Sequence, residues 1–277
     1  MIQNAGRAER CVTGYYADLK KQNDKKRWEK ERRKTNTGIA VVILSVLVLF
    51  AAVFLISGTR RKGAADVFSG RPYSQSIVTA NPSEIPDYDG EDYIILNNGR
   101  PCFNEYDKRN IRGEYYSELD FFSRCGPAVA GIDASMRPAE KRESIGMIKP
   151  SGWNQVKYEG LVDSDPPYLF NRCHLIAHAL TGQNANEKNL ITGTRYMNAV
   201  VMLQFETQVM EYLEHSGNHV LYRVTPYFKG TELVARGVEM EALSVEDNGK
   251  GVCFHVFIYN RQPGVIINYQ TGQSRAE

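Results

Sequence analysis

The spacing of apolar residues in the last third of the chain predicts one long helix. From Thr194 to about Glu214, apolar positions recur every three or four residues, and neither Pro nor Gly interrupts the run. This spacing is typical of a helix with one buried face, and Ser216-Gly217 would end it. The apolar stripe consists of Met202, Phe205, Val209 and Leu213. A second, short helix is predicted at 117–123.

Segments rich in β-branched and aromatic residues predict strands on both sides of the long helix. Tyr93–Leu96 is followed by the turn-forming Asn97–Gly99, and Tyr168–Phe170 follows two prolines. Further strands are predicted near 219–228, 233–245, 253–260 and 265–269. One long helix between groups of strands is typical of an α+β fold built on an antiparallel sheet.

An uninterrupted apolar run extends from Gly38 to Ser57. Twenty uncharged residues, at about 1.5 Å per residue, span the ~30 Å hydrocarbon core of a bilayer. A buried core helix would show a polar face, and a cleaved signal peptide would have a shorter apolar stretch. We therefore predict a single transmembrane helix over residues 38–58.

Charge is distributed unevenly along the 277 residues, although the formal net charge is only +2. Residues 1–37 carry eleven Lys and Arg against five Asp and Glu, a net charge of +6, and the rest carry 23 against 27, a net charge of −4. This balance excludes a globally basic nucleic-acid-binding domain. The positive-inside rule predicts a cytoplasmic tail at 1–37 and, outside the cell, a tether at 59–90 and a folded domain at 91–277.

Four of the five cysteines fall in the part of the chain predicted to face an oxidising exterior. Four cysteines allow three disulfide pairings, and all four can equally be free and buried. They form no Cys-x-x-Cys pair, so a zinc knuckle is not predicted. These cysteines are Cys102, Cys125, Cys173 and Cys253.

The segment Asn171–His174 and the helix that follows it contain the residue types that phosphodiester hydrolysis needs. A neutral imidazole such as His174 can take a proton from water, and Arg172 can stabilise charge that develops on phosphorus. Mg²⁺ prefers oxygen ligands, and the Asn198 amide can supply one. Glu206 lies eight residues later, roughly 80° around an α-helix, where it could hold metal-bound water.

These residues resemble the DNA/RNA non-specific endonucleases with a ββα-metal fold, especially the Gram-positive membrane-anchored or secreted members. That family carries Asp-Arg-Gly-His at the end of a strand and a metal-binding Asn on the next helix. A second Asn lies nine residues before the metal ligand, and a Glu lies eight residues after it. Asn189, Asn198 and Glu206 reproduce these intervals. The resemblance covers roughly 90–272 and is strongest from 170 to 206.

The resemblance implies a role for each residue of the motif. It implies that His174 is the general base, that Arg172 binds phosphate and that Asn198 is the metal ligand. Glu206 would order the waters of the metal, and Asn189 would support the site. The implied protein is a single-pass cell-membrane nuclease with an extracellular ββα-metal domain. It would use Mg²⁺, with Mn²⁺ as a substitute, to cleave DNA without sequence specificity and leave 5′-phosphates; RNA is a further candidate substrate.

Two residues depart from the family motif. Asn171 stands where the family has Asp. An Asn side chain can keep the hydrogen bond of the Asp but not its charge. Cys173 stands where the family has Gly. Because cysteine has a Cβ, a left-handed backbone conformation at this position would cost about 1–2 kcal/mol.

The departure at Asn171 favours an alternative, a non-catalytic surface module that binds nucleic acid or a protein partner. A zinc hydrolase built on His174 and His178 is another alternative, although no Glu follows His174 as a zinc-protease motif requires. A Cys173–His174 nucleophilic pair is disfavoured, because adjacent strand residues point to opposite faces.

Overall fold

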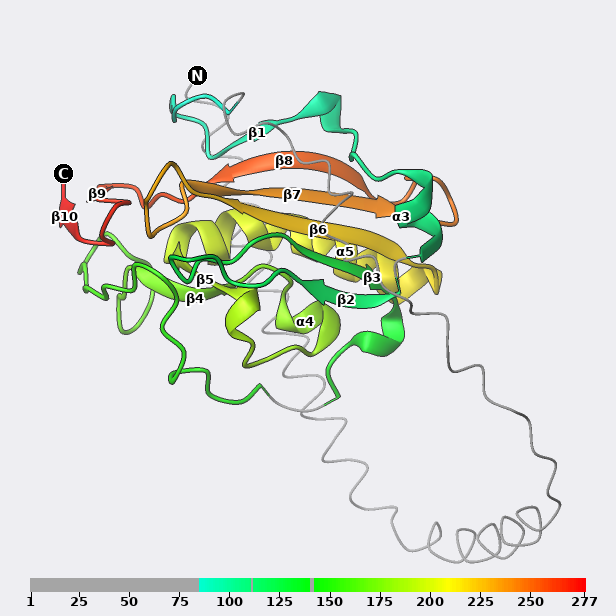
Figure 1. Cartoon of the computed structure of the whole chain (residues 1–277), viewed down its shortest axis with the longest axis horizontal. Helices are drawn as coiled ribbons and strands as arrows, with labels where there is room; N and C mark the ends of the chain where they lie inside the picture. Colours follow the sequence, from blue (N-terminus) through cyan, green and yellow to red (C-terminus); the bar gives the residue numbers. More distant parts are fainter. Residues whose placement is uncertain (1–84, 111, 140–141) are drawn as a thin grey trace, which may run out of the picture. The chain divides into compact units, whose positions relative to one another are not determined.

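The structure is a computed structural model that describes residues 85–110, 112–139 and 142–277 (Figure 1). These residues belong to a compact unit that spans Gly70–Glu277. The predicted cytoplasmic tail, the transmembrane helix at 38–58 and most of the tether lie outside the described residues. Within the described ranges, no helix is long and apolar enough to cross a bilayer.

The main sheet has six strands, and every neighbouring pair is antiparallel. This confirms the predicted α+β class with an antiparallel sheet. In spatial order the strands are β1 (Tyr93–Ile95), β8 (Cys253–Tyr259), β7 (Gly237–Ser244), β6 (Val220–Tyr227), β3 (Ala128–Ile132) and β2 (Gly113–Tyr116). Strands β6, β7 and β8 lie inside the sheet, and nearly all of their residues are buried, on both faces.

Two small hairpins stand apart from this sheet. One pairs β4 (Phe170–His174) with β5 (Leu190–Thr194), and the other pairs β9 (Val265–Ile267) with β10 (Ser274–Ala276). The short elements between the strands are η3 (Asn97–Gly99), α3 (Glu105–Asn110), η4 (Ala134–Met136), α4 (His178–Thr181) and η5 (Glu187–Asn189).

The predicted long helix follows β5 directly and packs against the main sheet (Figure 1). Its first turns include a π-helical segment, η6 (Met197–Val201), which continues as α5 (Met202–Ser216). The Thr194 hydroxyl accepts a hydrogen bond from the Met197 backbone N–H at 3.1 Å, as a helix N-cap does. Gly217 ends the helix with φ of 66°, a conformation that glycine adopts without strain.

The predicted apolar stripe of this helix is buried, as expected. It packs against alternate residues of β6, β7 and β8 to form the main core. This packing holds the first turns of the helix, which carry Asn198, next to the β4–β5 hairpin, which carries Arg172 and His174. The stripe residues are Met202, Phe205, Val209 and Leu213.

The helix predicted at 117–123 is wrong. Asp120 accepts hydrogen bonds from the backbone N–H groups of Phe122 and Arg124, both at 2.9 Å, and this local turn replaces a helix. The strand predicted at Tyr168–Phe170 is displaced, because the strand begins at Phe170, where pairing with Thr194 of β5 starts. The motif therefore lies within β4 rather than after a strand.

Candidate functional site

Strand β4 places Arg172 and His174 on one face and Cys173 on the other, because side chains alternate along a strand. Cys173 is fully buried, and its Sγ lies 3.5 Å from the Met202 sulfur. The hairpin thus presents the arginine and the imidazole together while the cysteine anchors it to the core. All four cysteines in the described residues are free.

Both ring nitrogens of His174 have defined partners. Nε2 lies 2.9 Å from the backbone oxygen of Asn184, and Nδ1 lies 3.1 Å from Nη2 of Arg142. A carbonyl oxygen only accepts hydrogen bonds and a guanidinium only donates them. The proton is therefore on Nε2, and the lone pair of Nδ1 faces Arg142.

The environment of His174 keeps its ring neutral. Burial lowers the pKa of the imidazole to about 4, and the positive charge of Arg142 acts in the same direction. The bond to the Asn184 carbonyl opposes these effects only in part. At neutral pH the ring is therefore uncharged, and Nδ1 is the atom that can accept a proton once the Arg142 donor is drawn away from it.

Arg172 is held by backbone and aromatic groups. Its Nε donates to the Ile148 carbonyl, and its Nη2 donates to the Gly146 carbonyl at 2.8 Å. The guanidinium carbon lies 4.3 Å from the ring centroid of Trp153. Two of its five N–H donors are used in these bonds, so the others can reach a phosphate oxygen.

Asn189 is fully buried and holds the chain that follows β4. Its Oδ1 accepts from the Ile176 N–H at 2.8 Å, and its Nδ2 donates to the Ile176 carbonyl at 3.0 Å. Its own carbonyl accepts from the Leu175 N–H at 2.9 Å. Asn189 therefore acts on the backbone immediately after His174 and positions the strand end that carries the imidazole.

Asn198 lies in the π-helical turn η6 and is half-buried. Its side chain makes no hydrogen bond to any residue that the structure describes, so the amide oxygen is available to a ligand. A π-helical turn rotates less per residue than an α-helical one. Asn198 and Glu206 are therefore closer to one face of the helix than the roughly 80° expected for a regular α-helix.

Glu206 is buried, with 8% of its surface exposed. Its carboxylate has no hydrogen bond or ion pair to the described residues, and burial raises its pKa to about 7. Burial raises the pKa of the Cys173 thiol, and the charge of Glu206 acts in the same direction. A buried carboxylate of this kind fits a hydrated cation, which would supply the missing partner.

Direct contacts connect only some of the predicted site residues. Arg172 and His174 share a face of β4, and Asn189 braces the end of that strand. No hydrogen bond or ion pair within the described ranges links His174 to Asn198 or Glu206. Arg142 was missed by the sequence analysis, because it lies in a loop of no regular pattern and only the folded chain brings it to His174.

The two departures from the family motif have structural explanations. Cys173 lies in an extended strand without a left-handed backbone, so the predicted strain is absent. Gly193 on β5 provides the space, because a Cβ there would lie 2.6 Å from the Cys173 Cβ. Asn171 shares the Cys173 face of β4 and does not reach the imidazole, which Asn184 orients instead.

The zinc-hydrolase alternative gains no support from this geometry. In the described part of the chain, His174 and His178 share no third ligand of the kind that zinc sites need.

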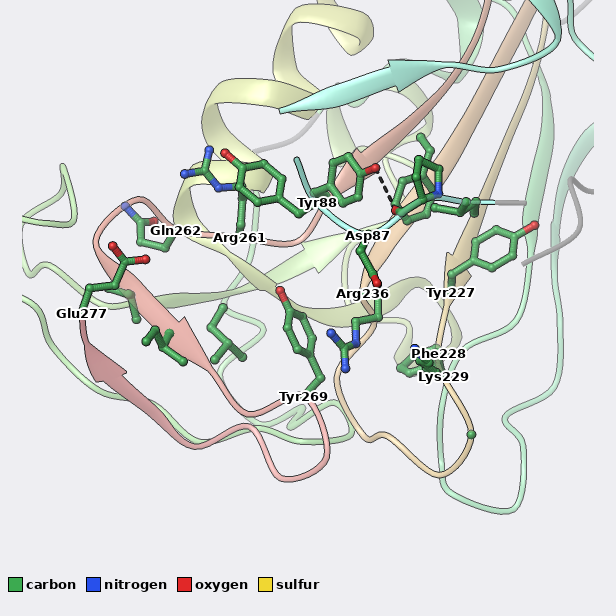
Figure 2. A pocket seen from close by; sticks show the side chains of 18 residues that line it. Asp87, Tyr88, Tyr227, Phe228, Lys229, Arg236, Arg261, Gln262, Tyr269 and Glu277 are labelled. Carbon is green, nitrogen blue, oxygen red and sulfur yellow. Dashed lines mark hydrogen bonds between the residues drawn. The ribbon is translucent and has the colours of Figure 1, made fainter. Parts of the chain in front are cut away.

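A separate cavity of about 780 Å³ lies where the segment that precedes β1 meets β8 and β9 (Figure 2). Its walls contain two arginine–tyrosine stacks: Arg261 lies 4.4 Å from the ring centroid of Tyr88, and Arg236 lies 4.3 Å from that of Tyr269. None of the five predicted site residues lines it. The candidate site therefore rests on the hairpin and helix, not on this cavity.

Comparison with known proteins agrees with the motif. Residues 105–246 match the DNA/RNA non-specific endonuclease family. A deoxyribonuclease from Streptococcus dysgalactiae subsp. equisimilis is 34% identical over 111 residues, which cover 38% of this chain and 32% of that protein. The chain thus matches about a third of the length of this curated relative.

Two solved structures resemble the described fold. NucA from Streptococcus agalactiae with magnesium bound has 25% identity and a TM-score of 0.57, covering 66% of this chain and 87% of NucA. The Sda1 nuclease with bound zinc has 26% identity and a TM-score of 0.57, covering 67% of this chain and 96% of Sda1.

Proposed function

The chain belongs to the DNA/RNA non-specific endonuclease family, and we propose that it is a metal-dependent endonuclease that hydrolyses DNA, with RNA as a further substrate. The observation that carries this proposal is the state of His174. Its Nε2–H is fixed on the Asn184 carbonyl, and its Nδ1 lone pair is directed at Arg142. A neutral imidazole with Nε2 fixed as the donor has Nδ1 as its proton-accepting atom, which is the protonation state that a general base requires.

In this mechanism Nδ1 of His174 takes a proton from the water that attacks phosphorus. Negative charge then develops on the phosphate oxygens, and the remaining donors of Arg172 are placed to stabilise it. Arg142 supplies a second positive charge beside the imidazole. A phosphate that enters the site would accept hydrogen bonds from Arg142 and free Nδ1 to act as a base.

Asn198 would bind a divalent cation through its amide oxygen, and Glu206 would hold the waters of that cation. The support is the Asn198 amide, which makes no hydrogen bond to the residues that the structure describes, and the buried Glu206 carboxylate. An oxygen-only ligand set favours Mg²⁺, with Mn²⁺ as a substitute. When bound, the cation supplies positive charge to the scissile phosphate.

The cell-surface location is also part of the proposal. Its support is the uncharged run at 38–57 and the net charge of +6 that precedes it. Alkaline extraction of membranes and proteolysis of intact cells test this location. Release of the chain by alkaline carbonate, or protection of the C-terminal domain from added protease, would refute it.

A plasmid-nicking assay of the full-length chain tests the enzymatic proposal. We expect nicking that requires Mg²⁺ or Mn²⁺ and falls by on the order of 10²–10⁴-fold in His174→Ala. Gel-shift binding of DNA without cleavage would instead support the non-catalytic module.

A further inference from the structure

A second cluster of metal-binding side chains lies on the face of the main sheet that points away from α5. Alternate residues of β8, such as Val256, pack in the core with α5, so His255 points to the opposite face. Glu241 of β7 pairs directly with His255, and Cys102 reaches both from the segment between η3 and α3. The Cys102 thiol, a Glu241 oxygen and a His255 nitrogen all lie within 4.8 Å of one another.

The imidazole of His255 is oriented by a carboxylate on its far side. Its Nε2 lies 2.5 Å from Oε1 of Glu239, which directs Nδ1 toward Cys102. Nδ1 donates to the Arg100 carbonyl oxygen at 3.1 Å and lies 3.9 Å from the Cys102 Sγ, so a metal ion that binds Nδ1 displaces its proton. A carboxylate that accepts the second N–H of a histidine is the usual partner of a metal-bound imidazole.

The carboxylate of Glu241 is held equally firmly. Its Oε1 accepts from the Cys102 backbone N–H at 2.6 Å, and its Oε2 accepts from Nε of Arg223 at 2.6 Å. Glu241 and His255 are buried, whereas Cys102 is only half-buried. The cluster is therefore preorganised on its inner side and accessible from solvent at the thiol.

We propose that Cys102, Glu241 and His255 bind one Zn²⁺ ion at this position, independently of the nuclease site. Thiolate, imidazole and carboxylate are the ligands that zinc takes in proteins, whereas Mg²⁺ prefers an all-oxygen set. Tetrahedral zinc with ordinary bond lengths holds sulfur and nitrogen ligands ~3.6 Å apart. The observed 3.9 Å between Sγ and Nδ1 needs only a small inward movement.

The site would join the segment before α3 to the centre of the sheet. Zinc binds the thiolate and the neutral imidazole, so binding releases the thiol proton and the Nδ1 proton to solvent. Binding to the folded chain alone raises its thermal stability. The Arg100 carbonyl or a water would complete the four ligands. No Cys-x-x-Cys pair marks this site, because its ligands come from three separate segments.

The test uses the full-length chain with Asn198→Ala, which removes the proposed magnesium ligand, after treatment with a chelator. Zn²⁺ is added in excess Mg²⁺, and bound metal is counted by elemental analysis after gel filtration. Co²⁺ is added separately to reveal thiolate coordination through its near-ultraviolet absorption. We expect one equivalent of Zn²⁺, a cobalt–thiolate band and a rise in Tm on adding Zn²⁺.

Two cysteine variants in the same background make the test specific. Cys102→Ser should lose the bound equivalent, the band and the Tm rise while its metal-free Tm stays close to the parent. Cys253→Ser is the matched control, because Cys253 is an exposed cysteine two residues before His255 on the same strand, and it should keep all three. Absence of the band in the parent, or a band that depends on Cys253 rather than Cys102, overturns the proposal.

Discussion

The Nε2 atom of His174 lies 2.9 Å from the backbone oxygen of Asn184, and this contact determines which ring nitrogen can act as a base. Asn184 lies in the loop between α4 and η5, ten residues after the histidine. The carbonyl of this loop orients the imidazole without a carboxylate.

The pH profile of cleavage should reflect the low pKa of His174. Burial lowers that pKa to about 4, so the ring stays neutral and active down to that pH. At Mg²⁺ concentrations that saturate the site at every pH, we expect kcat/KM of plasmid nicking to fall about tenfold per pH unit only below about pH 4, because the imidazolium cannot accept a proton. An acid limb near pH 6.5 would contradict the buried environment.

Acid unfolding must be distinguished from protonation of His174 in this profile, because both lower activity at low pH. The unfolded chain protonates His174 near its ordinary pKa of about 6.5, whereas the folded chain does so only near 4. The contribution of His174 to the free energy of unfolding is therefore fully present above about pH 6.5 and is lost as the pH falls toward 4. Far-ultraviolet circular dichroism at each pH separates unfolding from loss of the base.

Arg142→Ala should lower activity and raise the pKa of His174. The guanidinium lies 3.1 Å from Nδ1 and disfavours the imidazolium, so removing it removes a positive charge from both the base and the phosphate. We expect a loss on the order of 10²-fold in kcat/KM. NMR titration of His174 measures the pKa, and Arg142→Lys, which keeps the charge, should move it less. Unchanged cleavage by Arg142→Ala would remove this residue from the site.

Replacing Asn189 should lower the stability of the fold, whereas replacing Asn198 should leave the stability nearly unchanged and remove activity. Asn189→Ala leaves the buried N–H and carbonyl of Ile176 without partners, so it should cost about 2–4 kcal/mol in free energy of unfolding. Asn198→Ala breaks no hydrogen bond to the described residues and should change that free energy by less than about 0.5 kcal/mol. Urea unfolding measures both.

The activity of the same two variants completes the comparison. Asn198→Ala should abolish nicking that depends on Mg²⁺ while remaining folded. Normal cleavage by Asn198→Ala would contradict its role as the metal ligand. Full stability of Asn189→Ala would contradict its structural role.

Cys173 and Gly193 should show strong energetic coupling. A Cβ at position 193 would lie 2.6 Å from the Cys173 Cβ and 2.9 Å from the Met197 methyl, so Gly193→Ala should cost about 1–3 kcal/mol. In a Cys173→Gly background the first contact is absent, and the same change should cost less. Urea unfolding of the four proteins gives the coupling energy; a value near zero would mean that the two positions do not compete for space.

The affinity for Mg²⁺ should depend on the ionisation of Glu206. Burial raises the pKa of this carboxyl to about 7, so the anion that would hold the cation's waters forms only as the pH rises through about 7. We expect the Mg²⁺ concentration for half-maximal nicking to fall as the pH rises from 6 to 8. Glu206→Gln should weaken Mg²⁺ and flatten this dependence. A wild-type requirement that does not vary with pH would contradict the role of Glu206.

The sequence by itself determined the parts of this protein that depend on local spacing. The stripe that begins at Met202 predicts α5, because a helix repeats its faces every three to four residues, and Gly217 predicts its end. Segments rich in β-branched and aromatic residues predict most of the central strands. The intervals between Asn189, Asn198 and Glu206, together with Arg172 and His174, identify the family, because they are set along one hairpin and one helix.

Only the tertiary structure decided how these residues are held. Arg142 reaches His174 from thirty-two residues away, and the backbone of Asn184 selects the tautomer; neither contact has a sequence signature. The π-helical turn at Asn198 and the space that Gly193 leaves for Cys173 likewise come from packing between elements. Local periodicity specifies which face of an element is buried, whereas the charges and hydrogen bonds around a catalytic group depend on segments that meet only when the chain folds.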